Sequence, residues 1–408
     1  MIIKISDEVK YIIETLESNG YEAYAVGGCV RDSLLGNSPA DWDICTFALP
    51  GQTMACFDDK DIIKTGLKHG TVTLILNNRP FEITTYRREC DYTDNRHPDK
   101  VEFIGDLKED LSRRDFTVNA MAYNPTRGLV DFFGGIDDLD RKVIKCVGEA
   151  DKRFSEDALR IMRALRFAAV LGFRIDGDTA KAMRGNKELL KNISVERIAG
   201  ELNKLIMGDG AGGLLTEHKS IITEIIPGLT SDLKSIDSVP KDLYIRLAAL
   251  LRDTGEAQLG AYAAQGVLTR LKYDKNTIAA VTQLIMYRDA EIFPGRTDIK
   301  RWLNNIGEGQ LRRLIEVKRS DVLAQSESRR HNQLDKLEEA EALLNEIIDK
   351  RLCFSLKDLA VNGKDLIAVG IPEGGEIGVI LKKLTDMVID EKVENNKQKL
   401  LAEVRSAR

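Results

Sequence analysis

The sequence is poor in the residues and patterns that build disulfide frameworks, zinc sites and membrane spans. Its 408 residues include six cysteines, with no Cys-x-x-Cys pair, and only four histidines. This usage indicates reduced thiols and argues against a zinc centre. No apolar run reaches the ~18 residues of a membrane-spanning helix, and the N-terminus has no apolar signal core. We therefore expect a soluble, cytoplasmic protein with no membrane partner.

An excess of positive charge, a common mark of nucleic-acid binding, is also missing. The formal net charge is −5, but local basic patches can bind nucleic acid in an acidic protein, so this balance excludes little. We find neither an internal repeat nor a low-complexity segment. The length predicts about two to four domains, at roughly 150 residues per domain.

The most informative stretch reads YAVGGCVRD over residues 24–32, followed by DWDI over residues 41–44. An apolar strand leads into Gly27 and Gly28, where the lack of a Cβ lets the chain turn tightly and approach a ligand. The turn opens a short helix whose free N–H groups suit phosphate. Arg31 can then donate paired hydrogen bonds to phosphate oxygens.

Two carboxylates follow this turn. On a strand, Asp41 and Asp43 would point to one face, roughly 6–7 Å apart. Carboxylates beside a phosphate site can hold paired divalent ions roughly 3.5–4 Å apart. Oxygen ligands completed by substrate phosphates favour Mg²⁺. Taken singly, a Gly-Gly pair is usually only a turn and an Asp-x-Asp only a solvated strand end.

In this order and spacing, the motifs resemble the nucleotidyltransferase signature of the polymerase β superfamily. GGCVRD followed by DWDI is similar to the class II tRNA CCA-adding enzymes and bacterial poly(A) polymerases. The resemblance covers nearly the whole chain and is most specific over residues 24–170. It implies an α+β fold, with a polymerase β-like nucleotidyltransferase head containing a mixed sheet, followed by an all-helical neck, body and tail. We place these parts at residues 1–140, 141–206, 207–320 and 321–408.

Local patterns outline the head. Residues 6–19 read as an amphipathic helix that Ser6 can cap. Alternating runs at 71–76 and 81–85, on either side of a short Asn-rich turn, predict a β-hairpin. Glu82 lies on the second hairpin strand, and the resemblance places it beside the metal site as a catalytic carboxylate. A solvent-facing strand glutamate is the alternative.

Residues 87–100 form a polar, turn-rich stretch typical of a loop. Within it, Tyr92, Asp94, Arg96 and Pro98 fit the flexible loop that CCA-adding enzymes carry and CC-only enzymes lack. The resemblance therefore implies an enzyme able to add the terminal A. An ordinary surface loop is the alternative.

A dense polar cluster follows in DLSRRDFTVNA, residues 110–120. Arg114 could hold a triphosphate oxygen by bidentate donation. Asp115 and Asn119, at helical spacing, could hydrogen-bond ribose hydroxyls. The string resembles a family motif, although by itself it could be a charged helix turn. The next family-like motif, DFFGGIDDL at residues 131–139, suits a hinge or a tight junction between head and neck, and we expect it to be structural and mobile.

A second focus is FSEDALRIMRALRF, residues 154–167, which reads as a helix capped by Ser155. Asp157 and Arg160, three apart, would be neighbours on its surface. An Asp can accept from the exocyclic amine of cytosine or adenine, and an Arg can donate to ring acceptors. Uracil offers the reverse pattern, and a site with unpaired polar groups can reject an analogue by roughly 10⁴–10⁵.

This E-D-x-x-R string resembles the base-reading motif of the family, which implies that Asp157 and Arg160 select the base. Arg163 and Arg166 match positions that contact the bound nucleotide. A helix laced with salt bridges is the structural alternative.

The remaining chain is less informative. Arg252 occupies the place where related HD phosphohydrolases carry a metal-binding His, so we expect no hydrolase site there. Basic groups at 312–313, 318–319 and 329–331 could follow an RNA backbone or be solvated. Residues 359–378 resemble the C-terminal tail of Gram-positive-type class II enzymes, which grips the far end of the tRNA acceptor–T arm.

Together the resemblance implies template-independent addition of C, C and A to the 3′ end of tRNA, using CTP and ATP. Mg²⁺ is the expected cofactor, held by Asp41 and Asp43, and the tRNA acceptor and T arms are the expected partner. Alternatives are an A-adding partial enzyme, a poly(A) polymerase or a non-catalytic RNA-binding protein. The intact motifs argue against the last, and the lack of a basic Gly-Arg/Lys-Arg/Lys-Phe string after the neck argues against the poly(A) polymerase. We expect a monomer, with a dimer as the alternative.

Overall fold

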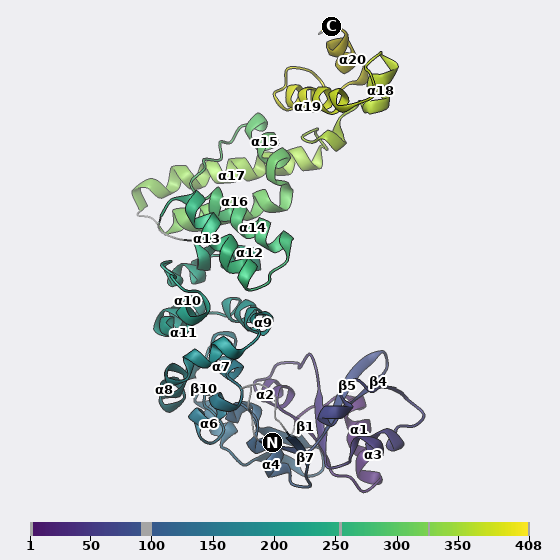
Figure 1. The fold of residues 1–408 in the computed structure, drawn as a ribbon, viewed down its shortest axis with the longest axis vertical. Helices are drawn as coiled ribbons and strands as arrows, with labels where there is room; N and C mark the ends of the chain where they lie inside the picture. The colour runs from purple at the N-terminus through teal and green to yellow at the C-terminus, as the bar shows by residue number, and fades with distance from the viewer. Residues whose placement is uncertain (1–2, 91–99, 253–254, 325–326, 407–408) are drawn as a thin grey trace. The chain divides into compact units, whose positions relative to one another are not determined.

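The computed structural model describes residues 3–90, 100–252, 255–324 and 327–406. The chain forms two compact units. The first comprises residues 1–229 with 270–273, and the second comprises residues 230–269 with 274–408. Figure 1 labels the helices and strands of both.

A mixed seven-stranded sheet forms the centre of the first unit. From edge to edge it runs β3 (Asp61–Ile63), β4 (Thr71–Leu76), β5 (Arg79–Thr85), β2 (Asp43–Thr46), β1 (Ala23–Val26), β8 (Met121–Asn124) and β9 (Gly128–Asp131). Strands β2 and β5 are parallel, and every other neighbouring pair is antiparallel. The expected mixed sheet of an α+β head is confirmed.

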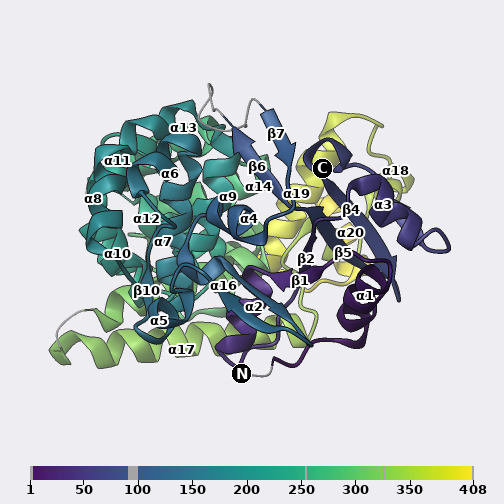
Figure 2. The same cartoon turned by 90° about the horizontal axis from the view of Figure 1, so that it is seen from below.

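Short helices cover this sheet. They are α1 (Asp7–Ser18), α2 (Gly28–Leu34), α3 (Pro50–Cys56), α4 (Leu107–Ser112) and α5 (Gly135–Asp140), with 3-10 turns η1 (Leu67–His69) and η2 (Thr117–Asn119). A separate antiparallel pair consists of β6 (Arg87–Cys90) and β7 (Lys100–Phe103). Figure 2 shows α1 and α3 side by side next to β4 and β5.

The helix expected over residues 6–19 is confirmed as α1. The Ser6 hydroxyl accepts a hydrogen bond from the Val9 amide at 3.3 Å, which caps the first turn. The apolar face of α1 is buried and packs on β1 and β2. The hairpin is confirmed as well, because Asn77 and Asn78 both have positive φ, the geometry of a two-residue type I′ turn.

The opposite face of the sheet packs under α4. Tyr24 and Cys45 form a buried cluster with Leu107 and Leu111 of that helix. Since alternate residues of a strand share a face, Asp43 projects from the same side of β2 as Cys45. The end of α4 therefore lies near the start of β2, where the carboxylates of interest are found.

Helices dominate after the head. They are α6 (Ala150–Glu156), α7 (Leu159–Leu171), α8 (Gly177–Gly185), η3 (Lys187–Asn192), α9 (Val195–Ile206), α10 (Ala211–Glu217) and α11 (Lys219–Ile225). Helices α7 and α9 pack along each other. The neck is not entirely helical, because β10 (Val143–Ile144) and β11 (Arg174–Ile175) form a parallel pair. Two-residue strands are too short to leave a periodic signal in the sequence.

The second unit is helical in its described part. Its elements are η4 (Leu233–Ser238), α12 (Leu243–Leu251), α13 (Ala257–Arg270), α14 (Lys275–Met286), α15 (Arg296–Ile306), α16 (Glu308–Leu323), α17 (Glu327–Asp349), η5 (Leu356–Asp358), α18 (Gly363–Ala368), α19 (Gly375–Ile389) and α20 (Lys397–Ser406). The boundary expected after residue 320 falls inside α16. None of the described helices combines the length and hydrophobicity needed to cross a bilayer.

Candidate active site

The glycine turn after β1 brings backbone and guanidinium groups together. Gly27 has φ 85° and ψ −130°, a conformation that side-chain-bearing residues rarely adopt. A Cβ at Gly27 would lie 3.1 Å from Nη1 of Arg114, and one at Gly28 would lie 3.6 Å from Nη2 of Arg31. The turn thus leaves room for both arginines beside the start of α2.

Two carboxylates share a face at the start of the sheet's parallel pair. Asp43 and Glu82 are register partners on β2 and β5, so their side chains project to the same side. Asp41 precedes β2 and is not part of the strand, which corrects the expectation that both aspartates lie on it. The ladder begins only at Asp43, and sequence spacing cannot reveal where strand pairing starts.

The pKa of Asp43 is raised mainly because the surrounding protein desolvates its carboxyl group. The carboxylates of Glu82 and Asp41 raise it further, while Arg114 opposes them. A divalent cation would relieve this repulsion, and carboxylate oxygens suit it. Within the described part of the chain, no three His, Cys, Asp or Glu side chains are grouped to hold a metal by themselves. Ligands from the substrate would have to complete the shell.

A chain of polar contacts joins the head to α7. Arg31 donates through Nη1 to the Asn119 Oδ1 at 2.6 Å, and its Nε donates to Asp32 at 2.8 Å. The Asn119 amide donates to Asp115 at 3.1 Å. Asp115 in turn accepts from Nε and Nη2 of Arg163 at 2.8 and 2.6 Å. Four of the expected site residues are therefore connected directly, although they come from three separate stretches of sequence.

Asp115 has its acceptor sites filled. Besides Arg163 and Asn119, it accepts from the Phe116 amide at 2.8 Å, and a carboxylate offers about four such positions. Burial by itself would raise the pKa of Asp115, but the Arg163 charge and these hydrogen bonds lower it to about 2. Asp115 is thus a fixed anion that orients Arg163.

The helix expected from residue 154 is broken. Ser155 lies inside α6, where its hydroxyl donates to the Lys152 carbonyl at 2.8 Å, so the expected cap is wrong. The chain turns extended at Asp157, and α7 begins at Leu159. Oδ1 of Asp157 accepts from the Leu159 amide at 3.0 Å. Local spacing suggested Ser155 because it cannot show where one helix ends and the next starts.

Asp157 and Arg160 remain adjacent, since the Arg160 amide donates to the Asp157 carbonyl at 3.0 Å, but their side chains have different partners. Oδ2 of Asp157 pairs with Nη2 of Arg197 at 3.2 Å, from α9. Arg160 donates through Nη1 to Glu156 at 3.0 Å and through Nη2 to the Arg113 carbonyl at 2.9 Å. The two expected base readers lie close in sequence but have different partners in this structure.

Helix α9 supplies a residue that sequence reasoning missed. Glu201 is buried, lies 2.6 Å from Nε of Arg166 and 3.9 Å from Nη1 of Arg163, and so neutralises two expected nucleotide contacts. Glu201 lies four residues after Arg197, hence on the same face of α9. The sequence did contain a signal for Glu201, because a glutamate four residues after an arginine on an amphipathic helix indicates a shared charged face.

The junction between head and neck is tightly built. Asp131 accepts hydrogen bonds from the Gly135 amide at 2.9 Å and the Ile136 amide at 2.9 Å, which caps α5. A Cβ at Gly135 would lie 2.3 Å from the Thr117 carbonyl oxygen. The glycine therefore permits close backbone contact, as the tight-junction alternative requires. Tyr92, Asp94, Arg96 and Pro98 of the expected flexible loop lie outside the described residues.

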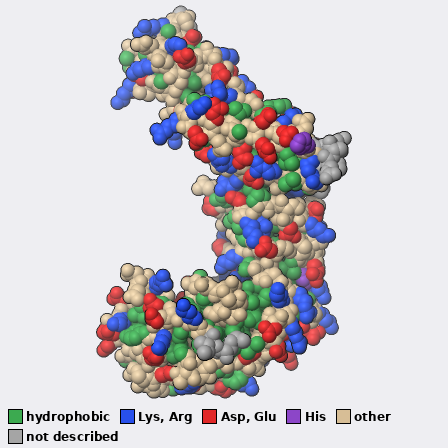
Figure 3. All heavy atoms as spheres, turned by 180° about the vertical axis from the view of Figure 1, so that it is seen from behind, with side chains coloured by type: hydrophobic (Ala, Val, Ile, Leu, Met, Phe, Trp, Pro, Cys, Tyr) green, Lys and Arg blue, Asp and Glu red, His purple; other side chains and the backbone are tan. Residues whose placement is uncertain are grey.

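The basic groups of the second unit are largely paired. Arg312 pairs with Glu308, Arg313 with Asp242 and Arg319 with Glu341, at 2.9, 2.9 and 2.6 Å. On the face that Figure 3 shows, acidic and basic side chains are interspersed over this unit. These ion pairs favour a structural role for the basic residues over a continuous RNA-binding surface.

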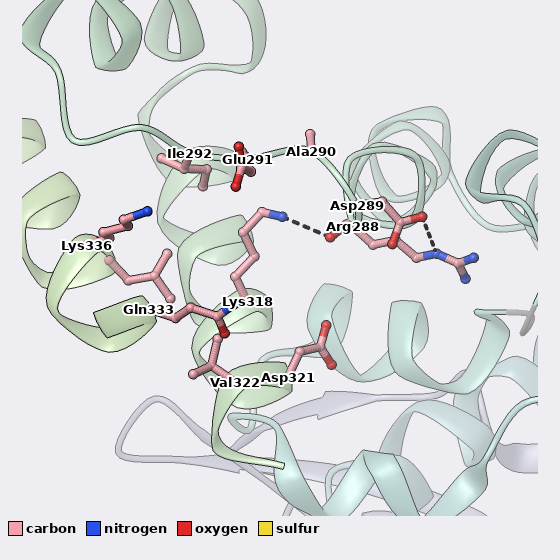
Figure 4. Close-up of a pocket in the computed structure, with 11 residues that line it drawn as sticks. Arg288, Asp289, Ala290, Glu291, Ile292, Lys318, Asp321, Val322, Gln333 and Lys336 are labelled. Atoms are coloured by element: carbon pink, nitrogen blue, oxygen red, sulfur yellow. Dashed lines mark hydrogen bonds and ion pairs between the residues drawn. The ribbon is translucent and has the colours of Figure 1, made fainter. Parts of the chain in front are cut away.

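The second unit also has a cavity of about 330 Å³, shown in Figure 4. Lys318 and Asp321 of α16 line it together with Lys336 of α17. The Lys318 ammonium donates to the Arg288 carbonyl at 2.8 Å, and burial lowers its pKa. Arg252 pairs with Asp321 at 2.7 Å, so the residue in place of the metal-binding His has a structural partner.

Comparison with protein-family models gives three matches along the chain. Residues 23–145 match "Poly A polymerase head domain", and residues 172–232 match "Probable RNA and SrmB- binding site of polymerase A". Residues 256–404 match a model for tRNA nucleotidyltransferase domain 2.

Curated relatives and a solved structure extend this similarity. A CCA-adding enzyme of Pediococcus pentosaceus is 34% identical over 410 residues, covering 97% of this chain and 96% of the relative. One of Lactiplantibacillus plantarum is 48% identical over 211 residues, 51% of each chain. The crystal structure of the Bacillus stearothermophilus CCA-adding enzyme in complex with CTP is 32% identical, with a TM-score of 0.79 and 98% of both chains covered.

Proposed function

Because the chain belongs to the CCA-adding enzymes, a family of tRNA nucleotidyltransferases, we propose that it adds C, C and A in turn to the 3′ end of tRNA without a nucleic-acid template. CTP and ATP are the nucleotide substrates, and the tRNA binds through its acceptor and T arms. In each step the tRNA 3′-hydroxyl oxygen attacks the α-phosphorus, the bond to the β-phosphate breaks and pyrophosphate leaves. The pairing in register of Asp43 and Glu82, beside Arg114, carries this proposal.

The family is metal-dependent, and we assign Mg²⁺ to Asp41 and Asp43, with Glu82 as the third carboxylate beside them. The raised pKa of Asp43 supports the assignment, because its causes include two neighbouring negative charges. When bound, Mg²⁺ would lower the pKa of the attacking hydroxyl and neutralise charge on the triphosphate. Asp41, which precedes β2, and Asp43, its first residue, would supply the oxygen ligands that hold the ion.

The arginines around the glycine turn are placed to bind the triphosphate. Arg114 lies against Gly27, and Arg31 lies against Gly28 at the start of α2. Arg163 and Arg166 of α7 add two further cations from the neck. Because phosphate oxygens can accept several charge-assisted hydrogen bonds, such a group suits a nucleoside triphosphate.

Asp115 and Asn119 have a more specific part in this proposal. We assign them to ribose hydroxyls, and a hydroxyl that binds Asp115 would have to displace one of the four N–H groups that now donate to its carboxylate. Their contacts with Arg31 and Arg163 support a role in orienting the phosphate-binding arginines as well.

Base selection is assigned to Asp157 and Arg160. Each Asp157 oxygen has one partner in the described structure and retains a lone pair for the exocyclic amine of cytosine or adenine. Within the described residues, the hydrogen bonds of Arg160 use both its Nη atoms and leave its Nε–H available for a ring acceptor. Uracil presents a carbonyl in place of the amine, so it would oppose the carboxylate.

A single-turnover assay tests the function directly. Three tRNA transcripts, ending before the first C, after C and after CC, are each given Mg²⁺ with CTP, ATP, UTP or CTP plus ATP. We expect completion of all three to CCA and refusal of UTP. Extension of the CC-ended transcript alone would make the chain an A-adding enzyme, and a long A tail would make it a poly(A) polymerase.

A further inference from the structure

Three guanidinium groups converge on one aromatic ring in the first unit. The Cζ atoms of Arg166, Arg31 and Arg163 lie 3.9, 5.1 and 5.2 Å from the centre of the Phe167 ring. Arg163 and Arg166 belong to α7, as does Phe167, whereas Arg31 comes from α2. The ring is therefore a shared contact for two cations of its own helix and one cation from α2.

Bringing these cations together is unfavourable in itself. Burial lowers the pKa of Arg166, and the charges of Arg163 and Arg31 lower it further, while Glu201 opposes them. The face of an aromatic ring carries partial negative charge and attracts cations, most strongly where water is excluded. Phe167 can thus offset part of the repulsion that remains beside the carboxylate partners of these arginines, which are Asp32, Asp115 and Glu201.

The ring is held in a fixed orientation. Phe167 is 7% exposed, and its ring packs edge-to-face against Phe116, with centroids 5.8 Å apart and planes at 80°. Phe116 is itself fully buried and follows Asp115, the anion that orients Arg163. Movement of the Phe167 ring would therefore disturb a packed aromatic pair.

We propose that Phe167 is a positioning residue for nucleotide binding, which holds Arg31, Arg163 and Arg166 converged before the triphosphate arrives. Side chains ordered in advance lose less conformational entropy on binding, so the ring increases nucleotide affinity without touching the substrate. This inference rests on the proposed function, because it takes the three arginines to contact the nucleotide.

The first test replaces the ring and keeps the site apolar. In Phe167→Leu we expect Kd and KM for CTP and for ATP to rise about tenfold, from the loss of cation–π contacts in a desolvated site. The change in kcat and in refusal of UTP should be smaller. Phe167→Tyr, which keeps the ring, should stay near the parent protein.

A matched control removes a similar ring elsewhere in the same unit. Phe57 is 1% exposed and packs edge-to-face on Tyr11, with centroids 6.2 Å apart. Among the cation–ring contacts of the described residues, none involves Phe57. Phe57→Leu should therefore cost stability but leave nucleotide affinity unchanged.

A second test changes the electron density of the ring with little change in packing, so it applies even if Phe167→Leu does not fold. Site-specific incorporation of mono-, di- and trifluorophenylalanine at position 167 withdraws electron density from the ring face with little change in volume. Kd for CTP and ATP, measured by calorimetry without tRNA, should rise with each fluorine. A flat series, or an equal loss in Phe57→Leu, would overturn the inference.

The same measurements separate this inference from the proposed function. If the parent protein binds nucleotide but extends no tRNA, the function is wrong, while the fluorine series still decides the role of the ring. If the parent protein binds neither CTP nor ATP, both proposals are wrong.

Discussion

The carboxylate of Asp157 pairs with Arg197 of α9 at 3.2 Å, and not with Arg160 three residues further along the chain. The cause is the extended conformation at Asp157, which ends α6 and turns the side chain towards α9. The orientation of a proposed base reader is therefore set by a helix about 40 residues away in sequence.

Replacing Asp157 should alter the choice of base more than the chemistry. In Asp157→Ala we expect much of a roughly 10⁴–10⁵-fold discrimination against UTP to be lost, because no carboxylate then opposes the uracil carbonyl. Single-turnover extension of CC-ended tRNA with ATP or UTP measures this. The matched control is Asp151→Ala on α6, because Asp151 only accepts an exposed hydrogen bond from Asn186. Unchanged selectivity in Asp157→Ala would remove it from base reading.

Replacing Asp43 should stop every addition. Asp43→Asn loses the charge and one ligand oxygen at the start of β2, so we expect kcat to fall by about 10³-fold or more with both CTP and ATP. The exposed Asp59, paired with Lys60 on the head surface, provides the control Asp59→Asn, which should stay fully active. Near-normal activity of the Asp43 variant would contradict the assigned metal site.

Removal of divalent cations should have the same effect, reversibly. Excess chelator should abolish extension of all three tRNA ends, and added Mg²⁺ should restore it. Calorimetric titration of Mg²⁺ in the presence of a non-hydrolysable ATP analogue should give binding that Asp43→Asn lacks. Full activity in chelator, after exhaustive dialysis, would exclude the two-metal mechanism.

Gly135 should tolerate no side chain. A Cβ there would meet the Thr117 carbonyl oxygen at 2.3 Å, so Gly135→Ala should destabilise the first unit by about 1–3 kcal/mol, as overpacking does. Gly200, on α9, has no atom within 4 Å of its Cβ position, and Gly200→Ala should stabilise by about 0.5–1 kcal/mol. Chemical denaturation measures the free energy of unfolding of both variants. If the two variants changed it equally, the backbone around Gly135 would have to shift and accommodate the added methyl group.

His218 should make the protein sensitive to mild acid. It is 1% exposed, neither ring nitrogen has a hydrogen-bond partner in the described structure, and burial lowers its pKa below 6.5. The unfolded chain then binds a proton more readily than the folded one, so stability falls as pH drops below about 6.5. His218→Leu should flatten Tm between pH 7 and pH 5.

The control for this effect is His331, whose side chain is 95% exposed. His331→Leu should leave the pH dependence of Tm as it is in the parent protein. An identical pH profile for the His218 variant would mean that this histidine protonates without cost in the folded state.

Sequence patterns were sufficient for the parts of the fold with strong local signals. Ser6 capping α1 and the Asn77–Asn78 turn were both recognisable, because each depends on a few adjacent residues. Strands β8 and β9 were not predicted. Each has four residues, and their pairing with β1 and with each other is decided by tertiary contacts that leave no clear period.

The candidate site, like the fold, could be predicted from the sequence only in part. Arg31 and Arg114 lie against the glycine turn and Asp43 lies near Arg114, a grouping that local motifs could suggest, while the roles of these residues stay predictions. The partners of α7 could not be read from the sequence, because Asp115 and Arg163 are 48 residues apart and Glu201 lies on another helix. The Glu201–Arg166 pair depends on the packing of α7 against α9, and the Asp115–Arg163 pair depends on the position of α7 relative to the head.

The break at Asp157 also limits which length changes evolution can accept. An α-helix turns about 100° per residue, so one residue inserted between Asp157 and Leu159 would rotate every side chain of α7 relative to the head. Arg163 would leave Asp115, and Arg166 would leave Glu201, while the sheet and its carboxylates stayed intact. Among homologues, insertions and deletions should therefore be excluded from this short connection even where neighbouring residues vary.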